Sequence, residues 1–299
     1  MENLESFVEK RPKAEATFGY GSGVFKQVGY DTKSHPQRDV IFLVSDLKKW
    51  HLENMDRNPE DYSLIGRVHL TNSPVENIKG LNKITYFSHI REHGFSYKYG
   101  VIEERDFLHN LSTWDNMFIT GRFQKPVMRI HSNDGVDEAI KYDRECALRI
   151  ACLLNQSETT VKEVLLSLCS LSYMGDTRML FAENPNKVKN IVEGSYEVLS
   201  GVYMTPREYM HVQGDNVIIN HRMLLSEIEF LPSSLVEYLA SLNTDLSNLK
   251  QVRANIVQFL TEHNKRESFY QTLDGFRTNG IVRSVPYALA KVKKKVVGK

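Results

Sequence analysis

One continuous apolar run, Val40–Val44, most constrains what this chain of 299 residues can fold into. It is too short for an ordinary helix and lacks the alternation of a half-exposed strand. Such a run is expected for a central strand that is covered on both faces. Asp39 precedes the run and Asp46 follows it closely. The sequence therefore predicts a layered sheet with one carboxylate near each end of a central strand.

The apolar pattern changes near residue 135, after the turn Asn133–Gly135. Before it we expect a helix over 1–10, a strand from Val24, a helix over Leu47–Met55 ended by Asn58-Pro59, and strands near Ile84–Phe87, Tyr97–Ile102 and Phe118–Ile130. After it we expect helices over 137–155, 158–173, Val188–Tyr203 and Leu231–Leu260, with a short strand at Val217–Ile219. This order predicts an α+β fold with a mixed sheet in 1–135, a mostly helical part with a β-hairpin in 136–230, further helices in 231–280 and a tail over 281–299.

Bulk composition is that of an ordinary globular protein, with 41% hydrophobic and 25% charged residues. No apolar run approaches the roughly 20 residues that a membrane span needs. Cys146, Cys152 and Cys169 lie in apolar, helix-like stretches and form no C-x-x-C pair. Free buried thiols in a reducing compartment are therefore expected.

The glycine turn of Gly19, Gly21, Ser22 and Gly23 ends sixteen residues before Asp39. Glycines let backbone amides approach a phosphate closely, and Ser22 adds a hydroxyl donor. Val24 stands where a dinucleotide fingerprint needs glycine, and the Gly-Lys-Ser/Thr of a Walker loop is absent. The turn therefore predicts binding of a nucleoside triphosphate by another kind of loop, with a simple hairpin turn as the alternative.

Asp39 and Asp46 are the candidate ligands for magnesium, which prefers one or two carboxylates together with phosphate oxygens. The alternative is that both merely cap the ends of the strand. Their odd separation points them to opposite faces of an ideal strand. Nucleotidyltransferases usually have acids two residues apart, and Ile41 occupies that place.

Several short motifs in one order resemble the mitochondrial-type phosphatidate cytidylyltransferases, the CDP-diacylglycerol synthase family also called translocator assembly and maintenance proteins. The matching stretches are Tyr20–Phe25, Asp39–Asp46, Trp50-His51 with Asn54, Tyr62-Ser63, Lys98–Ile102, Trp114–Asn116, Gly121–Val127 and Leu171–Met179, with a looser match from Leu231-Pro232 to Arg283-Ser284. The resemblance implies a polymerase-beta-like nucleotidyltransferase domain, a winged-helix-like domain and magnesium-dependent reaction of CTP with phosphatidic acid. It also implies a place in phospholipid and cardiolipin biosynthesis.

Within these motifs the resemblance gives cationic and cleft residues their roles. Lys98 and Arg122, on strand-like segments, are expected to stabilise phosphates as catalytic residues with Asp39 and Asp46. Gly21, Ser22, Gly23 and Lys125 are expected to bind CTP, and His51, Tyr62, Asp176 and Arg178 to line the substrate cleft. The alternatives are surface cations, a packed histidine and a structural Asp176–Arg178 salt bridge.

Two further features concern metals and membranes. His89–His93 matches the H-x-x-E-H zinc pattern, but it lies among strand-like residues, whereas that motif needs a helix. In 281–299, Val285, Leu289, Val292 and Val296 fall on one helical arc beside basic residues (Arg283, Lys291, Lys293, Lys294, Lys295 and Lys299) with no acid. The tail therefore predicts docking on an anionic membrane. A nucleic-acid arm, which we do not expect because only Tyr287 is aromatic, and a solubilising tail are the alternatives.

The sequence thus predicts an enzyme that transfers CMP from CTP to phosphatidic acid with Mg²⁺. A nucleotidyltransferase for another acceptor, such as a tRNA end or a small molecule, and a non-enzymatic membrane adaptor are the alternatives. The N-terminal residues, Met1–Glu5, lack the blocks of a secretory signal and the character of a mitochondrial presequence. This favours a protein of the bacterial cytoplasm that is bound peripherally to the inner face of the membrane. The matrix side of the mitochondrial inner membrane is the alternative.

Overall fold

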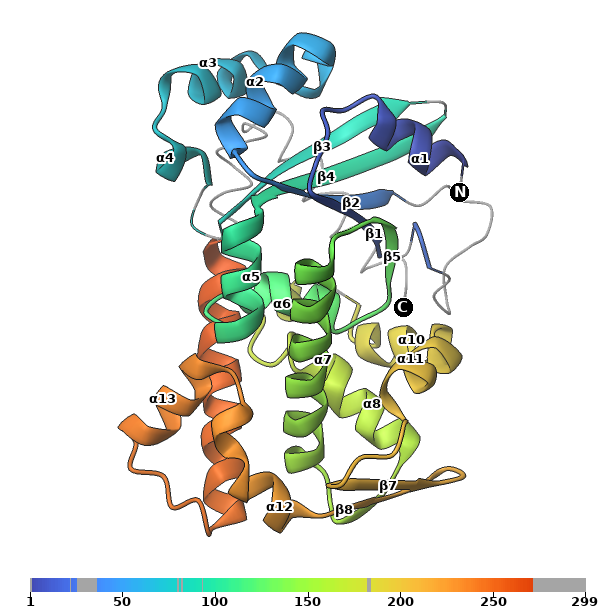
Figure 1. The fold of residues 1–299 in the computed structure, drawn as a ribbon, viewed down its shortest axis with the longest axis vertical. Helices are drawn as coiled ribbons and strands as arrows, with labels where there is room; N and C mark the ends of the chain where they lie inside the picture. The colour runs from blue at the N-terminus through green and yellow to red at the C-terminus, as the bar shows by residue number, and fades with distance from the viewer. Residues whose placement is uncertain are drawn as a thin grey trace.

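A computed structural model of the chain describes residues 2–270 except 22, 26–36, 80, 82, 93 and 182–183. Figure 1 shows a sheet with helices on two sides in the upper part, above a mostly helical lower part. The strands are both parallel and antiparallel. The predicted α+β fold with a mixed sheet is confirmed.

The larger sheet has five strands in the order β3-β4-β2-β1-β5. Their bounds are β1 Ala16–Tyr20, β2 Arg38–Val44, β3 Ile84–Glu92, β4 Phe95–Glu103 and β5 Val127–His131. The predicted central strand is β2, which pairs in parallel with β4 and antiparallel with β1. Because β2 lies between two strands and both its faces are covered, its run of apolar residues has no polar interruption.

The two faces of this sheet have separate cores. On one side, which we call the α2 face, Val40 and Phe42 pack with residues of α1 (Glu2–Glu9), α2 (Leu47–Arg57) and α4 (Val75–Lys79). On the other side, which we call the α6 face, Ile41 and Leu43 pack with residues of α5 (Glu104–Thr113), α6 (Met117–Phe123) and α7 (Asp134–Leu154). Alternate residues of a strand point to opposite faces, so the position of any side chain on β1, β2 or β4 can be assigned from its neighbours.

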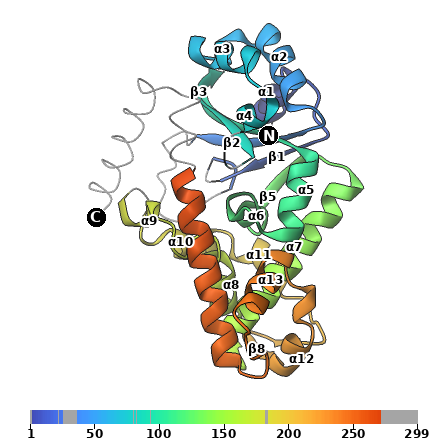
Figure 2. The ribbon, with the colours of Figure 1, turned by 90° about the vertical axis from the view of Figure 1, so that its left-hand side faces the viewer.

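The lower part is built around α7 and the helix over 249–270, which Figure 2 shows running upward toward the sheet. Its other elements are β6 Glu158–Thr160, α8 Val161–Ser170, α9 Arg178–Phe181, α10 Lys187–Gly194, α11 Tyr196–Tyr203, β7 Met210–Gln213, β8 Asn216–Ile219, α12 His221–Ser226 and α13 Ser233–Ser241. β6, β8 and β7 form a second, antiparallel sheet. The upper part also contains α3 Leu64–Asn72, and short 3-10 turns lie at Pro59–Asp61 and Ile228–Phe230.

Several predicted elements are confirmed. The helix after the central strand ends at Arg57, with Asn58 as its C-cap directly before Pro59, and the helix predicted over 137–155 is α7. The strand at Val217–Ile219 belongs to a hairpin of β7 and β8. Cys146, Cys152 and Cys169 are buried and free.

The strand predicted from Val24 does not begin there, and residues 26–36, into which it would continue, lie outside the described residues. The strand lies before the glycine turn, in β1, and Val24 and Phe25 belong to the turn itself. Their backbone amides both donate to the Gly21 carbonyl, at 3.1 and 2.9 Å. These bonds close the turn where a strand was expected to begin.

The strand predicted over Phe118–Ile130 is wrong, because its first half is the helix α6. Asn116 caps that helix by accepting a hydrogen bond from the Phe118 amide at 2.9 Å. All of α6 except Arg122 is buried, so its apolar residues are not confined to one helical stripe. The predicted bend at Gly121 lies within the helix, and the strand β5 follows it.

Three predicted helices have different bounds. The segment 158–173 begins with β6, and Thr160 then forms a capping box with Glu163 that starts α8. The segment Val188–Tyr203 is two helices, α10 and α11, separated at Ser195. The segment Leu231–Leu260 contains α13 and the first 12 residues of the helix over 249–270, with a non-helical link between them.

Within the described residues, no helix is long and apolar enough to cross a membrane.

Candidate functional site

Three side chains form a row across the sheet at the end where β1 stops and β2 begins. Tyr20 on β1 pairs with Asp39 on β2, and Asp39 pairs with Lys98 on β4. Since Val40 and Phe42 lie on the α2 face, Asp39 lies on the α6 face. By the same alternation Lys98, between the α2-face residues Tyr97 and Tyr99, also lies on the α6 face. The sheet therefore brings together two predicted catalytic residues from distant parts of the sequence.

Gly21 lies directly beside this row. Its φ angle of 80° is in the left-handed region, which residues with a side chain rarely adopt. A Cβ atom on Gly21 would lie 2.9 Å from Oδ2 of Asp39, so a side chain there would crowd the carboxylate. A Cβ atom on Gly23 would overlap the backbone oxygen of Gln37, so that glycine lets the turn close against the start of β2. Ser22 lies outside the described residues.

The helix α6 adds Arg122 to the site. Its guanidinium carbon lies 4.9 Å from the ring centre of Tyr20 and 4.0 Å from that of Phe118. Arg122 was predicted on a strand, but it lies in the last turn of α6, which covers this face of the sheet. The guanidinium is therefore stacked between the sheet and its own helix, and its contact with Tyr20 brings it to the row that contains Asp39.

Asp176 and Arg178 reach the same region from the second part of the chain. Their side chains form a two-pronged ion pair, with the shortest contact 2.6 Å between Nη2 and Oδ2, and Asp176 is buried. The salt bridge considered as the alternative is therefore present. The guanidinium carbon of Arg178 is also 5.6 Å from the ring centre of Phe118, so the pair lies beside Arg122.

Lys125 was predicted to bind CTP, but its amine contacts protein groups. Nζ donates to the carbonyl of Gly121 and, at 2.7 Å, to the hydroxyl of Ser172. Burial lowers the pKa of Lys125 to about 8. A Cβ atom on Gly121 would overlap the side chain of Ser172. Lys125 thus joins the end of α6 to the segment that leads to Asp176, where the two parts of the chain are in close contact.

Asp46 is not near Asp39, so the predicted pair of metal ligands is not formed. It is the N-cap of α2 and accepts a hydrogen bond from the Lys49 amide at 2.9 Å. From Asp39 to Val44 alone, β2 rises by roughly 17 Å at about 3.3 Å per residue. One ion bound at about 2 Å from each ligand cannot join carboxylates so far apart. Asp46 has a capping role, as in the alternative, but it caps the start of the helix α2 and not an end of the strand.

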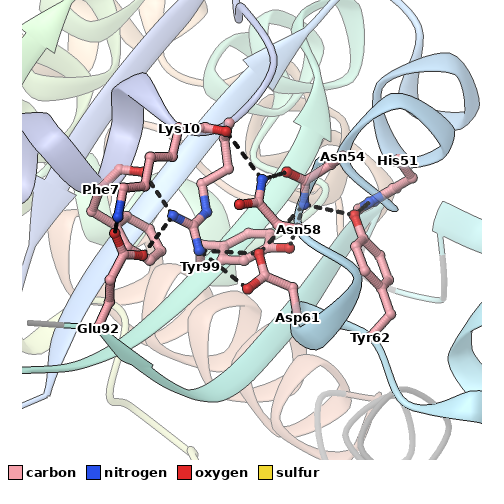
Figure 3. A network of polar contacts seen from close by, with 10 residues as sticks. Phe7, Lys10, His51, Asn54, Asn58, Asp61, Tyr62, Glu92 and Tyr99 are labelled. Atoms are coloured by element: carbon pink, nitrogen blue, oxygen red, sulfur yellow. Dashed lines mark hydrogen bonds and ion pairs between the residues drawn. The ribbon is translucent and has the colours of Figure 1, made fainter. Parts of the chain in front are cut away.

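His51 and Tyr62 were predicted to line the cleft, but both are buried on the α2 face. Figure 3 shows them at one end of a polar network in which His51 Nδ1 lies 3.0 Å from the Tyr62 hydroxyl. Asn54 donates to the hydroxyls of Tyr62 and Tyr99 at 2.9 and 3.0 Å. Burial lowers the pKa of His51 to about 3, so the ring is neutral and does not serve as an acid or base near neutral pH.

The other end of this network is a buried ion pair. Arg11 donates to both carboxylate oxygens of Asp61 at 3.1 Å, to Glu92 at 3.0 Å and to the Phe7 carbonyl at 2.8 Å. The side chains of Arg11 and Asp61 are 1% and 0% exposed. The network therefore fastens α1 and the turn after α2 to the sheet, and it is closed to a ligand.

A magnesium site at Asp39 fits the residues that are present. Within the described residues, no three His, Cys, Asp or Glu side chains lie close enough together to hold a metal ion by themselves. Magnesium does not need such a group when substrate phosphates supply oxygens, because one or two carboxylates then suffice. The missing side chain of Gly21 leaves room next to the Asp39 carboxylate, at the turn predicted to hold a phosphate.

Two aromatic residues of the site, Tyr20 and Phe118, were not predicted from the sequence. Tyr20 directly precedes Gly21, so its position in the motif was the available signal, whereas Phe118 was assigned to a strand. The H-x-x-E-H match was rejected as a zinc site because it needs a helix, and residues 89–92 lie in β3. His93 lies outside the described residues.

Two cationic side chains, a carboxylate and a glycine turn on one face of a mixed sheet form a site of the class suited to phosphorylated ligands. The chain belongs to the family described as "Phosphatidate cytidylyltransferase, mitochondrial", which matches residues 4–223. This is a family of enzymes. The resemblance seen in the sequence is thereby confirmed.

Curated relatives carry the same name. A protein of Schizosaccharomyces pombe is 30% identical over 100% of this chain and 84% of its own length. One of Dictyostelium discoideum is 29% identical over 98% and 84%, and one of Saccharomyces cerevisiae is 31% identical over 92% and 65%. All three are named mitochondrial. These names agree with the alternative location, and nothing in the comparisons supports the bacterial one.

Proposed function

We propose that this chain transfers CMP from CTP to phosphatidic acid, which yields CDP-diacylglycerol and pyrophosphate. The observation that carries the proposal is the row of Tyr20, Asp39 and Lys98 beside Gly21, with Arg122 stacked over Tyr20. The relatives named phosphatidate cytidylyltransferase support the choice of both substrates. In this proposal, residues 1–135 form the nucleotidyltransferase domain. Residues 136–230 form the winged-helix-like domain, with the hairpin of β7 and β8 as its wing.

In the reaction, an oxygen of the lipid phosphate attacks the α-phosphorus of CTP. A P–O bond forms there as the bond to the bridging oxygen of pyrophosphate breaks, and that oxygen takes the electron pair. The nucleophile is already anionic near neutral pH, so no strong general base is required. The chain's contribution is to position the reactants and to offset negative charge.

Each site residue then has a defined task. The backbone of Gly21, Ser22 and Gly23 holds the triphosphate, and Lys98 and Arg122 face its negative oxygens. Asp39 holds Mg²⁺, which when bound neutralises charge on the triphosphate and on the pyrophosphate leaving group. The Asp176–Arg178 pair lies beside Phe118, at the edge of this site.

The decisive experiment incubates the protein with labelled CTP, Mg²⁺ and vesicles that contain phosphatidic acid, and looks for a labelled liponucleotide. We expect the product with the native chain and its loss, with an unchanged melting temperature, for Asp39→Ala. The matched control is Asp46→Ala. It removes the carboxylate near the other end of β2 and should keep turnover. Full activity of Asp39→Ala would exclude the assigned site. Turnover of CTP without phosphatidic acid would point to another acceptor.

The tail over 281–299 lies outside the described residues, and we propose that it docks the enzyme on the anionic bilayer that holds its substrate. Its lysines beside an apolar stripe each contribute about 1 kcal/mol near such a surface. The relatives' names favour a mitochondrial membrane, where the product would serve cardiolipin synthesis. Truncation after Asn279 should weaken vesicle pelleting while sparing CTP binding, and unchanged pelleting would exclude this role.

A further inference from the structure

The end of α6 that carries Arg122 is held by side chains of the second part of the chain. Arg144 Nε donates to the carbonyl of Phe123 at 2.9 Å, and the Tyr203 hydroxyl donates to the carbonyl of Gln124 at 2.7 Å. The last carbonyls of a helix have no partner within the helix, so these donors fix where α6 ends. The side chain of Gln124 makes a further contact with the second part of the chain, to Asp143 on α7.

Asp143 is 0% exposed. Its Oδ1 atom accepts two hydrogen bonds, from Trp114 Nε1 at 2.8 Å and from Gln124 Nε2 at 3.1 Å. Two acceptor atoms of this cluster have no hydrogen-bond donor among the described residues, namely Asp143 Oδ2 and Gln124 Oε1. A carboxylate with one bare oxygen in a closed interior is costly, because nothing there replaces its hydration.

Nearby cations lessen this cost but do not hydrogen-bond to the bare oxygen. Arg144 gives its Nε to Phe123, and Lys125 gives its amine to Gly121 and Ser172 rather than to Asp143. A proton on Oδ2 removes the buried charge and turns that atom into a donor. A planar carboxyl and a planar amide that share one N–H···O bond can then close a second one, O–H···Oε1.

We propose that Asp143 is protonated in the folded protein and forms a two-bond carboxylic acid–amide pair with Gln124, which positions the end of α6 that bears Arg122. One proton on Oδ2 of Asp143 gives both that atom and Oε1 of Gln124 a hydrogen-bond partner. The protonation state is independent of the proposed function, whereas the positioning role rests on it. Asp143 acts through Gln124 and α6 and contacts no reacting group.

Electrostatics agree with this assignment. Burial raises the pKa of Asp143 to about 8, against the opposing effect of Arg144 and Lys125. The other titratable groups around it are Tyr142 and Cys146 on α7 and Tyr203 on α11, and burial raises the pKa of each, so they are neutral near pH 7. No further acid competes for the proton there.

Stability should therefore depend on pH in a defined window. The unfolded carboxyl has a pKa of about 4. Between about 4 and about 8 the folded state binds the extra proton, so the contribution of Asp143 to stability falls as pH rises and is constant above about 8. Asp143→Asn has no such dependence, and its amide can form the same two bonds with Gln124.

The first test compares melting temperatures of the full chain and Asp143→Asn from about pH 5 to about pH 9. We expect the variant to gain on the native chain as pH rises to about 8 and the difference to be level above that. A difference independent of pH would overturn the proposal. Infrared spectra at neutral pH should contain a protonated carboxyl band that Asp143→Asn removes. The matched control, Asp61→Asn, should leave that band in place, and absence of the band from the native chain would also overturn it.

The second test concerns positioning. We expect Asp143→Ala to lower kcat by about 10-fold to 100-fold, as for residues that orient active-site groups, and Asp143→Asn to restore turnover. Gln124→Glu should lose activity and stability as pH rises, because two carboxyls then face each other. Combining it with Asp143→Asn restores an acid–amide pair and should rescue both. If Asp143→Asn is as inactive as Asp143→Ala, the positioning role is wrong. If the native chain shows no cytidylyl transfer, the stability and infrared results still decide the protonation state.

Discussion

The two faces of the five-stranded sheet carry polar residues for different purposes. On the α2 face, Arg11, Asp61, Asn54 and Tyr62 are buried and bonded to one another. On the α6 face, Asp39, Lys98 and Arg122 are partly exposed and lie beside the glycine turn. The same resemblance to a family pointed to residues on both faces. A shared motif therefore marks positions without separating those that hold the fold from those that meet a substrate.

Burial and bonding make that separation. A polar side chain whose groups are already paired inside the protein gains nothing from a ligand, and exposing it has a cost. His51 and Tyr62 fall on the closed side by this criterion, although the sequence placed them in the cleft. Each variant below is expected to change stability or turnover, but not both, according to the face on which it lies.

The largest effect on stability is expected for Asp61→Asn. It removes the fully buried counter-charge of Arg11, which then pairs with Glu92 alone, so unfolding free energy should fall by about 3–5 kcal/mol. Turnover per folded molecule should be unchanged, because the network is remote from Asp39. Urea denaturation measures the unfolding free energy, and an activity assay on the folded fraction measures the turnover. The matched control is the exposed Asp56→Asn in the preceding helix α2, expected within about 0.5 kcal/mol of the native chain.

On the opposite face, Lys98→Met should behave in the reverse way. Loss of a cation that faces developing negative charge is expected to lower kcat/KM about 100-fold, or about 2.7 kcal/mol. The flexible stem of the side chain is retained in size, so the melting temperature should hardly change. Lys49→Met, an exposed lysine on α2, is the control and should keep full turnover. Equal turnover of the two variants would contradict the division between the faces.

Much of the fold follows from the sequence because local patterns determine it. The five-residue apolar run of β2 is too short for an ordinary helix, the helix after it ends before Pro59, and α7 shows a clear amphipathic stripe. The helix α6 does not follow, because it is covered on all sides and an apolar segment of that length is compatible with either a helix or a strand. Its short length favours a strand, and the cap at Asn116 is the local feature that favours the helix.

The site is predictable only in part, for a related reason. The glycine turn and Asp39 can be recognised because they lie close together along the chain. The neighbour relation between Asp39 and Lys98 depends on strand register across 59 residues, which sequence spacing does not contain. The stacking of Arg122 on Tyr20 depends on which face α6 covers. Non-local packing of this kind is available from the structure alone.

A smaller effect is expected for Tyr62→Phe on the closed face. The hydroxyl receives a hydrogen bond from Asn54 and lies 3.0 Å from His51 Nδ1, so its removal leaves buried polar groups without that partner. The cost should be about 1–3 kcal/mol of unfolding free energy. KM for CTP and kcat should both remain native. A raised KM with normal stability would instead show that Tyr62 contributes to substrate binding, as the sequence predicted.

The smallest effect is expected for Asp46→Ala, which tests whether a carboxylate at the far end of β2 has any part in the chemistry. It removes the N-cap bond to the Lys49 amide and should lower unfolding free energy by about 1 kcal/mol. Asp46→Ser is the matched control, because a hydroxyl keeps the cap while removing the negative charge. If Asp46 only caps α2, the serine variant regains stability and both variants keep the native dependence of rate on Mg²⁺ concentration. If both need more Mg²⁺ than the native chain, the charge of Asp46 acts on the site from roughly 17 Å or more away, and the chemistry does not belong to one end of the strand alone.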